Sequence, residues 1–327
     1  MFALLRHATR ALLLLAIGSL PTAHAQTAYP TKPVRIIIAF GPGTGLDVMS
    51  RAFAERLTEQ MKQSFVVENR EGAGGTIGVV AAARSAPDGY TILFAANGPF
   101  AISPWQTPQP PYDPVNDFVG ITRVGVVPMI LVASTKAPFR NFEEMVAYAR
   151  ANPGKLDYAS SGVGTPSQLS VELIKRALKL DIRAVPYKST AQAMTDTIAG
   201  QVPLYMPSFP ATLNQIKAGQ VRGLAIGLSR RSDVMPDIPT VAEATRQPDF
   251  ETVVRYGFLA PKGTPAEIVT RLDAEIQKSL GTPQITTLFQ KVGATRSVAG
   301  PRDFAAQIRS DAEFGKKFIE SMGEAAR

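Results

Sequence analysis

The stretch that decides the fold is IIIAFGPGTGLD, residues 36–47. An apolar, β-branched run leads into a glycine-rich turn, and residues 46–61 then repeat apolar side chains four apart, which predicts a helix. The pattern continues downstream, where 64–70 and 90–96 predict strands and 76–86 predicts a helix between them. Strands that alternate with helices in this way predict a parallel sheet with helices on both faces.

The number of strand–helix units exceeds what one compact sheet usually holds, so we expect two α/β lobes. A proline-rich segment at 103–118 interrupts the alternation and predicts a surface loop. The pattern Gly-x-Gly-Thr stands at a strand-to-helix turn in each half, in GPGT (41–44) and GVGT (162–165), although a four-residue pattern also recurs by chance. If the repeat has a structural basis, each lobe offers a glycine turn at the carboxyl ends of its strands, where open α/β sheets bind ligands.

The first 25 residues predict export. Arg6 and Arg10 precede a short apolar stretch, and Ala23-His24-Ala25 has the form of a signal-peptidase site, so we expect cleavage after Ala25. The apolar stretch is too short to cross a bilayer core of about 30 Å. We therefore expect an exported protein of the periplasm.

The residue types exclude several kinds of chemistry. Both histidines, His7 and His24, lie in the leader, and the sequence has no cysteine. A mature chain without either excludes Ser-His-Asp and Cys-His catalysis, imidazole or thiolate metal sites and disulfides, and we expect no cofactor and no metal. The chain has 35 basic and 27 acidic residues, and its net charge of +8 falls to +6 without Arg6 and Arg10. Dispersed positive charge favours small anions over nucleic acid.

The glycine turn does not fit a nucleotide motif. The dinucleotide fingerprint, started at Gly41 or Gly43, needs a glycine where Leu46 or Val48 stands, and no loop carries the Gly-Lys-Ser/Thr of a Walker motif. Glycine turns at helix starts instead expose backbone N–H groups that suit a carboxylate. Three turns have this form: 41–47, 72–78 and 160–167. The alternative is that their glycines only make tight turns and helix caps.

Several strings together carry a family resemblance. They include YPTKPVRIIIAFGPGTGLDVMSRAFAERL (29–57), VVENREGAGGTIGVVAAARSAPDGYTILFAANG (66–98), YDPVNDF (112–118), VPYKST (185–190) and YGFLAPKGTP (256–265). The chain resembles the Bug-type (TctC-like) periplasmic solute-binding receptors of tripartite tricarboxylate transport systems, in order over nearly all of the mature sequence.

The resemblance implies an α/β fold, a two-lobed periplasmic binding protein of type II-like form. Each lobe would be a mostly parallel sheet flanked by helices, with the ligand cleft between the lobes. Residues 26–127 and 256–327 would form lobe 1 and residues 128–255 lobe 2, with crossovers at 126–134 and near 253–261.

The resemblance also implies which residues hold the ligand, mainly through backbone N–H groups, small hydroxyls and bridging waters. On lobe 1 they are Gly43, Thr44, Gly45, Asp47, Gly75, Thr76 and Asn97. On lobe 2 they are Ser161, Gly164, Thr165, Lys188, Ser189 and Ser208. Taken alone, Asn97 could equally shape its turn, Lys188 could be solvated and Ser189 could be a helix cap.

Two departures from the family pattern bear on the ligand. Leu46 stands where a small or hydroxyl residue is common, and Pro207 and Ser208 replace a polar acidic pair. Both changes favour an acid with an apolar or aromatic body over citrate. We expect a monomeric receptor without enzymatic activity that passes a small carboxylate to membrane permease subunits. Two alternatives stay open: a sensor or co-receptor subunit of a signalling system, and an exported enzyme that uses a carboxylate.

Overall fold

The computed structural model describes residues 29–42, 44–107, 109–160, 165–187, 189–248 and 250–322. The chain divides into two units, Met1–Thr31 and Lys32–Arg327, and all helices and strands described below belong to the second. The expected signal peptide and its cleavage site after Ala25 lie outside the described residues.

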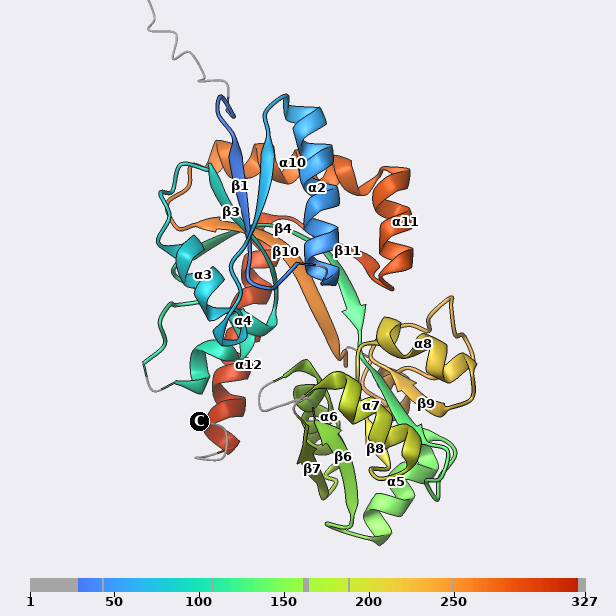
Figure 1. Cartoon of the computed structure of the whole chain (residues 1–327). Helices are drawn as coiled ribbons and strands as arrows, with labels where there is room; N and C mark the ends of the chain where they lie inside the picture. The colour runs from blue at the N-terminus through green and yellow to red at the C-terminus, as the bar shows by residue number, and fades with distance from the viewer. Residues whose placement is uncertain are drawn as a thin grey trace, which may run out of the picture. The chain divides into compact units, whose positions relative to one another are not determined.

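The described strands form two sheets (Figure 1). The first has the order β11-β4-β10-β3-β1-β2, and the second has the order β7-β6-β8-β5-β9. In these orders the first sheet consists of Thr295–Ala299, Phe118–Pro128, Val253–Pro261, Thr91–Ala96, Val34–Ile38 and Phe65–Asn69. The second consists of Ile182–Pro186, Leu156–Ser160, Leu204–Tyr205, Ile130–Ser134 and Val221–Ile226. We call the first sheet with its helices lobe 1 and the second sheet with its helices lobe 2.

Each sheet contains three adjacent parallel strands. In lobe 1, β1 pairs in parallel with β2 and β3, and in lobe 2, β6 pairs in parallel with β7 and β8. The remaining pairings are antiparallel: β10 runs against both β3 and β4, β11 runs against β4, and β5 runs against both β8 and β9. The parallel part of each sheet matches the sequence expectation, and the strands that carry the chain between the lobes make each sheet mixed.

The chain passes between the sheets at two points. It leaves lobe 1 at Met129, between β4 and β5, and returns after β9, before β10 begins at Val253. The Met129 N–H donates to the Thr252 carbonyl at 2.9 Å, and the Gly227 N–H donates to the Met129 carbonyl at 2.8 Å. These bonds join the two crossing segments to each other. The segment 253–261, expected near the second crossover, is β10 and lies in the first sheet.

Helices cover both faces of the first sheet. They are α2 (Gly45–Met61), α3 (Thr76–Ala83), α4 (Gly98–Ala101), α10 (Ala266–Leu280), α11 (Pro283–Lys291) and α12 (Pro301–Met322), with short 3₁₀ turns η1 (Ala73–Gly75) and η2 (Ser103–Gln106). On one face, Phe53 of α2 packs against Phe94 and Phe258, with ring centroids 6.0 and 5.3 Å apart. Ile37 and Leu93 face the other way, where they pack with side chains of α3, α4 and α12. This alternation is the period of two expected for a sheet buried on both sides.

The second sheet is buried on both faces in the same way. Its helices are α5 (Phe142–Ala151), α6 (Pro166–Leu178), α7 (Thr190–Ala199), α8 (Phe209–Lys217) and α9 (Val241–Thr245). Leu131 and Ala133 of β5 pack with side chains of α5, α6 and α9. Ile130 and Val132, the alternate residues of the same strand, pack with side chains of α7 and α8.

The proline-rich segment contains a short 3₁₀ turn, η2, and has no other helix or strand among its described residues before β4 begins at Phe118. Its Trp105 packs with Ile102 and with Phe318 of α12, in a cluster that also takes in Leu169 of α6. The tryptophan therefore holds the segment against lobe 1, and α6 brings lobe 2 to the same place.

Candidate functional site

Three helix starts lie at one edge of the lobe 1 sheet. The parallel strands β1, β2 and β3 lead into α2, α3 and α4, and the carboxyl ends of adjacent parallel strands share an edge. The three turns also touch. Asn69, at the end of β2, donates from its amide to the Phe40 carbonyl at 3.0 Å. A Cβ on Gly75 would lie 3.2 Å from both Ala39 and Pro99, so the turn before α3 packs between the other two.

The lobe 2 sheet has the same arrangement. Its parallel strands β6, β7 and β8 lead into α6, α7 and α8. The Tyr187 N–H, just after β7, donates to the Ser160 carbonyl at the end of β6 at 2.8 Å, which joins two of the turns. Helix starts therefore gather at one edge of each sheet, and helix N-termini favour anions.

The two Gly-x-Gly-Thr sequences end in matching helix caps. Thr44 is the N-cap of α2 with φ −71° and ψ 158°, and Thr165 is the N-cap of α6 with φ −70° and ψ 156°. Each hydroxyl accepts a hydrogen bond from the backbone N–H three residues on, in Asp47 and Gln168. The repeat therefore has a structural basis at its threonines.

The first turn of α2 leaves backbone donors for a ligand. Thr44 donates its hydroxyl proton to the Gly41 carbonyl at 3.0 Å, so the hydroxyl is already used twice. The N–H groups of Gly45 and Leu46 precede the capped N–H of Asp47 and have no acceptor in the described part of the chain. A Cβ on Gly45 would meet nothing within 4 Å, so this backbone is open to an approaching group.

Asp47 is engaged within the protein. Its side chain is 6% exposed and forms an ion pair with Arg51 at 2.9 Å. The same carboxylate accepts from Arg51 Nε at 3.2 Å and from Asn69 Nδ2 at 3.0 Å. These contacts fix the first turn of α2 against the end of β2, so the structure gives Asp47 a supporting position.

Gly75 and Thr76 shape the start of α3. Gly75 has φ +96°, a left-handed conformation that side chains other than glycine adopt rarely. The Thr76 side chain hydrogen-bonds the Tyr112 hydroxyl, which also donates to the Pro99 carbonyl. Burial raises the pKa of Tyr112, so the phenol stays neutral and keeps this donor role.

Two further predicted residues are at helix starts in lobe 2. Ser189 caps α7 by accepting from the Gln192 N–H at 3.2 Å. Ser208 stands at the N-cap of α8 and its side chain makes no capping bond. Four of the predicted residues lie outside the described residues: Gly43, Ser161, Gly164 and Lys188.

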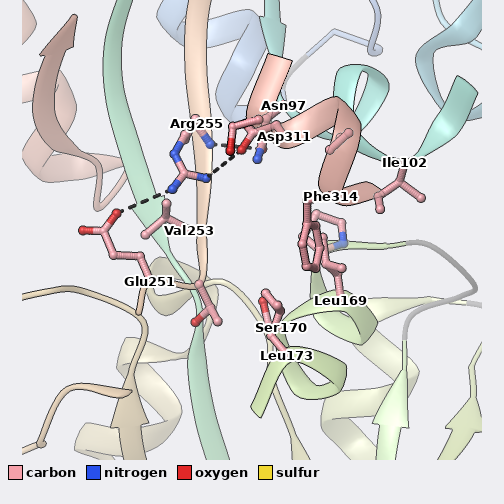
Figure 2. A pocket seen from close by; sticks show the side chains of 15 residues that line it. Asn97, Ile102, Leu169, Ser170, Leu173, Glu251, Val253, Arg255, Asp311 and Phe314 are labelled. Carbon is pink, nitrogen blue, oxygen red and sulfur yellow. Dashed lines mark hydrogen bonds and ion pairs between the residues drawn. The ribbon is translucent and has the colours of Figure 1, made fainter. Parts of the chain in front are cut away.

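Asn97 connects the lobe 1 edge to a cavity of about 230 Å³ (Figure 2). The cavity is lined from lobe 1 by residues around α4 and α12, and from lobe 2 by Pro166, Leu169, Ser170 and Leu173 of α6. The start of α4 and the first turns of α6 therefore face one space. Of the predicted residues that the structure describes, Asn97 is the one that lines it.

The polar end of the cavity is a charged cluster around Arg255 of β10. The backbone N–H of Arg255 donates to Asn97 Oδ1 at 3.1 Å. The guanidinium of Arg255 forms long ion pairs with Glu251 at 3.6 Å and with Asp311 of α12 at 3.7 Å. Asn97 also hydrogen-bonds the Asp311 carboxylate. Burial raises the pKa of Asp311, and the opposing effects of Arg255, Asn97 and Arg123 offset this only in part.

Sequence reasoning missed Arg255, Asp311 and Ser170. Arg255 sits in a strand that reads as apolar, and Asp311 reads as part of the polar face of a long helix. The available signal was a lone arginine inside VVRYGFLAP, a run otherwise free of charge. Apart from Glu251, the residues that surround it come from segments more than 50 positions away, which no local pattern brings together.

The fold is that of a two-lobed solute-binding protein. Its two α/β lobes are joined by two crossing segments, helix starts gather at the sheet edges, and a cavity lies between the lobes. The model of the tripartite tricarboxylate transporter family receptors matches residues 49–323. The chain belongs to this family.

Individual relatives agree with this assignment. Protein BugT of Bordetella pertussis is 36% identical over 274 residues, which cover 84% of each chain. The solved structure of periplasmic binding protein BugD is 33% identical with a TM-score of 0.71, over 90% of this chain and 99% of that one. A Rhodopseudomonas palustris protein solved with adipate is 32% identical with a TM-score of 0.74, over 90% of this chain and 98% of that one.

The described residues contain no helix that combines the length and the apolar character needed to cross a membrane.

Proposed function

We propose that this protein captures a small organic carboxylate in the cleft between its lobes and delivers it to membrane permease subunits of a tripartite tricarboxylate transporter. One observation carries the proposal. Thr44 and Thr165 cap α2 and α6 with the same backbone geometry, each at the carboxyl edge of its own lobe's parallel strands. Family membership and the relative solved with adipate support a carboxylate as the ligand.

Helix starts suit a carboxylate for electrostatic reasons. The aligned peptide dipoles place about half a positive charge at a helix N-terminus, and the first N–H groups lack intrahelical acceptors. In α2 these are the N–H groups of Gly45 and Leu46. Backbone groups of this kind bind an anion without arginine or lysine, as expected for glycine turns that carry no basic residue between 41 and 47.

The cavity supports an acid with an apolar body. Its walls include Ile102, Leu169, Leu173, Val253 and Phe314, which offer few partners to the many oxygens of citrate. The side chain of Leu46, from which an apolar pocket was also expected, is 4% exposed and belongs to the interior of lobe 1. The preference for an apolar or aromatic body therefore rests on the cavity walls.

Closure of the lobes on the ligand would use the two crossing segments as a hinge. The lobe boundaries expected from the sequence, 127/128 and 255/256, fall at the end of β4 and within β10, both strands of the lobe 1 sheet, and lie close to the bonded pair of Met129 and Thr252. A pair of short segments at element ends is the usual form of a hinge. We further propose that the leader is cleaved after Ala25 and that the receptor works in the periplasm as a monomer.

A thermal-shift screen of the purified mature chain tests the function. The panel contains mono-, di- and tricarboxylates with aliphatic and aromatic bodies, and native mass spectrometry checks the same samples for a bound acid. An acid at 100 times its Kd adds about 2.7 kcal/mol to the free energy of unfolding, which is a shift of several degrees. A panel in which no acid raises the melting temperature contradicts the proposal. Loss of uptake of the bound acid on gene deletion would then separate transport from sensing.

A further inference from the structure

The last turns of α12 contact lobe 2 through a buried aromatic side chain. Phe318 is 1% exposed and lies in a cluster of buried residues with Ala101, Ile102 and Ile319 of lobe 1. Leu169 of α6, which belongs to lobe 2, packs on the same cluster. Part of the surface that buries the end of α12 therefore comes from the other lobe.

A cation–π contact joins the same two helices. The guanidinium carbon of Arg176 in α6 lies 5.2 Å from the centroid of the Phe318 ring, within the distance at which an aromatic face attracts arginine. The ring of Phe314 stacks beside that of Phe318, with centroids 6.1 Å apart and planes at 21°. Leu169, Leu173 and Arg176 are spaced four and three residues apart, so they share one face of α6. Figure 2 shows the two leucines at the wall of the cavity that Phe314 also lines, so this face of α6 is turned towards α12.

The end of α12 is fixed on lobe 1 by its own contacts. Gly315 lies against α4, where a Cβ would collide with the Ala101 carbonyl. Lys316 lies over the ring of Trp105, with Nζ 5.8 Å from the ring centroid. These contacts hold the last turns of α12 in place, so Phe318 offers the other lobe a fixed contact point.

The contact between α6 and α12 is separate from the crossing segments that join the lobes at Met129 and Thr252. A hinge motion that moved α6 away from α12 would break the cation–π contact and expose Phe318 to water, which is unfavourable for an apolar side chain. The members of the contact are side chains of the protein alone. The contact therefore needs no ligand atom to form.

We propose that Leu169 and Arg176 of α6 and Phe318 of α12 form a latch that holds the two lobes together independently of a ligand. The latch raises the share of unliganded molecules whose lobes are closed. A ligand that binds the closed form then binds more tightly, because its apparent Kd equals the intrinsic Kd divided by that share. The inference goes beyond the proposed function, since the latch acts before any ligand arrives and on every ligand by the same factor.

Spin labels test the latch by measuring the separation of the lobes without ligand. The sequence has no cysteine, so Glu59→Cys in α2 and Thr195→Cys in α7 give two unique labelling sites at exposed positions, one in each lobe. Double electron–electron resonance gives the distribution of distances between the two labels. We expect the closed form to predominate in the labelled protein. Arg176→Ala should raise the ratio of open to closed molecules about two- to fivefold, the contribution of a cation–π contact at an exposed position.

Three further variants make the test specific. Arg150→Ala is the matched control, because it removes an exposed arginine from α5 of the same lobe and should leave the distance distribution unchanged. Leu169→Ala and Phe318→Leu should each open the lobes. In a double-mutant cycle, Arg176→Ala should add little to Phe318→Leu, because the ring that the guanidinium contacts is already gone. Arg176→Ala changes an exposed side chain and provides the readout if Phe318→Leu does not fold.

The outcomes separate the latch from the proposed function. Equal distance distributions in Arg176→Ala and Arg150→Ala, additive effects in the cycle, or a wild-type protein that is mostly open without ligand would each overturn the latch and leave the receptor function standing. Opening in Arg176→Ala in a protein that binds no acid would support the latch and contradict the proposed function. Where acids bind, Arg176→Ala should weaken all of them by one common factor of at most about five.

Discussion

Gly45→Pro is the substitution that tests the proposed anion-binding role of α2. Gly45 is the first residue of the helix, the position at which proline is favoured because the missing N–H has no intrahelical acceptor. The preceding residue, Thr44, has ψ 158°, which suits a residue before proline. Lobe 2 already carries this arrangement, because Thr165 with ψ 156° precedes Pro166 at the start of α6.

The expected magnitudes separate binding from stability. The substitution removes one backbone N–H that would donate to the ligand carboxylate, and a hydrogen bond to a charged group contributes about 1.5–3 kcal/mol. The Kd should therefore rise about 10- to 150-fold. A Cβ at this position meets nothing within 4 Å, so the free energy of unfolding should stay the same or rise by about 0.4–1 kcal/mol through the stiffer unfolded chain.

Gly45→Ala is the matched control, since it fills the same open space and keeps the N–H. Both variants are measured by calorimetry with the acid that gives the largest thermal shift, and by urea denaturation without ligand. Gly45→Pro should lose affinity and Gly45→Ala should keep it. Wild-type affinity in Gly45→Pro, or an equal loss in both variants, would refute the assignment of an anion-binding role to this helix start.

Three further predictions concern caps, charge and packing. Thr44→Val and Thr282→Val each remove a cap hydroxyl that accepts from the N–H at i+3 and donates to the carbonyl at i−3. Urea denaturation should show that the free energy of unfolding falls by about 1 kcal/mol in both variants. Calorimetry should show weaker ligand binding only in Thr44→Val. Burial raises the pKa of Asp311, so the folded state holds this proton to higher pH than the unfolded state does. The free energy of unfolding therefore falls as the pH rises from the unfolded pKa through the folded pKa of this carboxyl. Asp311→Asn should flatten this part of the pH profile of the free energy of unfolding. Gly315→Ala would place a Cβ 1.5 Å from the Ala101 carbonyl oxygen, so α12 must move off α4 and the free energy of unfolding should fall by about 1–3 kcal/mol, seen as a lower melting temperature.

The elements of this fold were predictable where their signal is local. The predicted strands at 64–70 and 90–96 correspond to β2 and β3 within one residue at each end, and the apolar run before the glycine turn belongs to β1, because β-branched runs and turn residues define a strand without reference to its neighbours. The direction in which β10 joins its sheet is not a local property. It depends on the chain returning from the other lobe to lie between β3 and β4, so the antiparallel half of each sheet could not be predicted from the alternation of strands and helices.

The candidate site shows the same division. The repeated Gly-x-Gly-Thr predicted two strand-to-helix turns, and Thr44 and Thr165, expected to hold the ligand, are the N-caps of the helices there. The environment of Asp47 was only half predictable, since Arg51 at i+4 is visible in the sequence and Asn69 on the neighbouring strand is not. Arg255 lay outside prediction altogether, because its setting combines β10, α12 and α6.

In the proposed function, the backbone binds the carboxylate and the side chains select among acids. The proposed helix starts would bind a carboxylate through N–H groups that every sequence possesses, so they would favour a class of ligand without selecting its member. Selection among acids would then fall to the cavity, where the side chains of Leu169, Leu173 and Phe314 differ chemically from anything the backbone can supply. Because each task depends on different residues, substitutions at Gly45 should weaken all acids by a similar factor. A variant at Gly45 that changed the relative affinities for two acids would show that one group of residues performs both tasks.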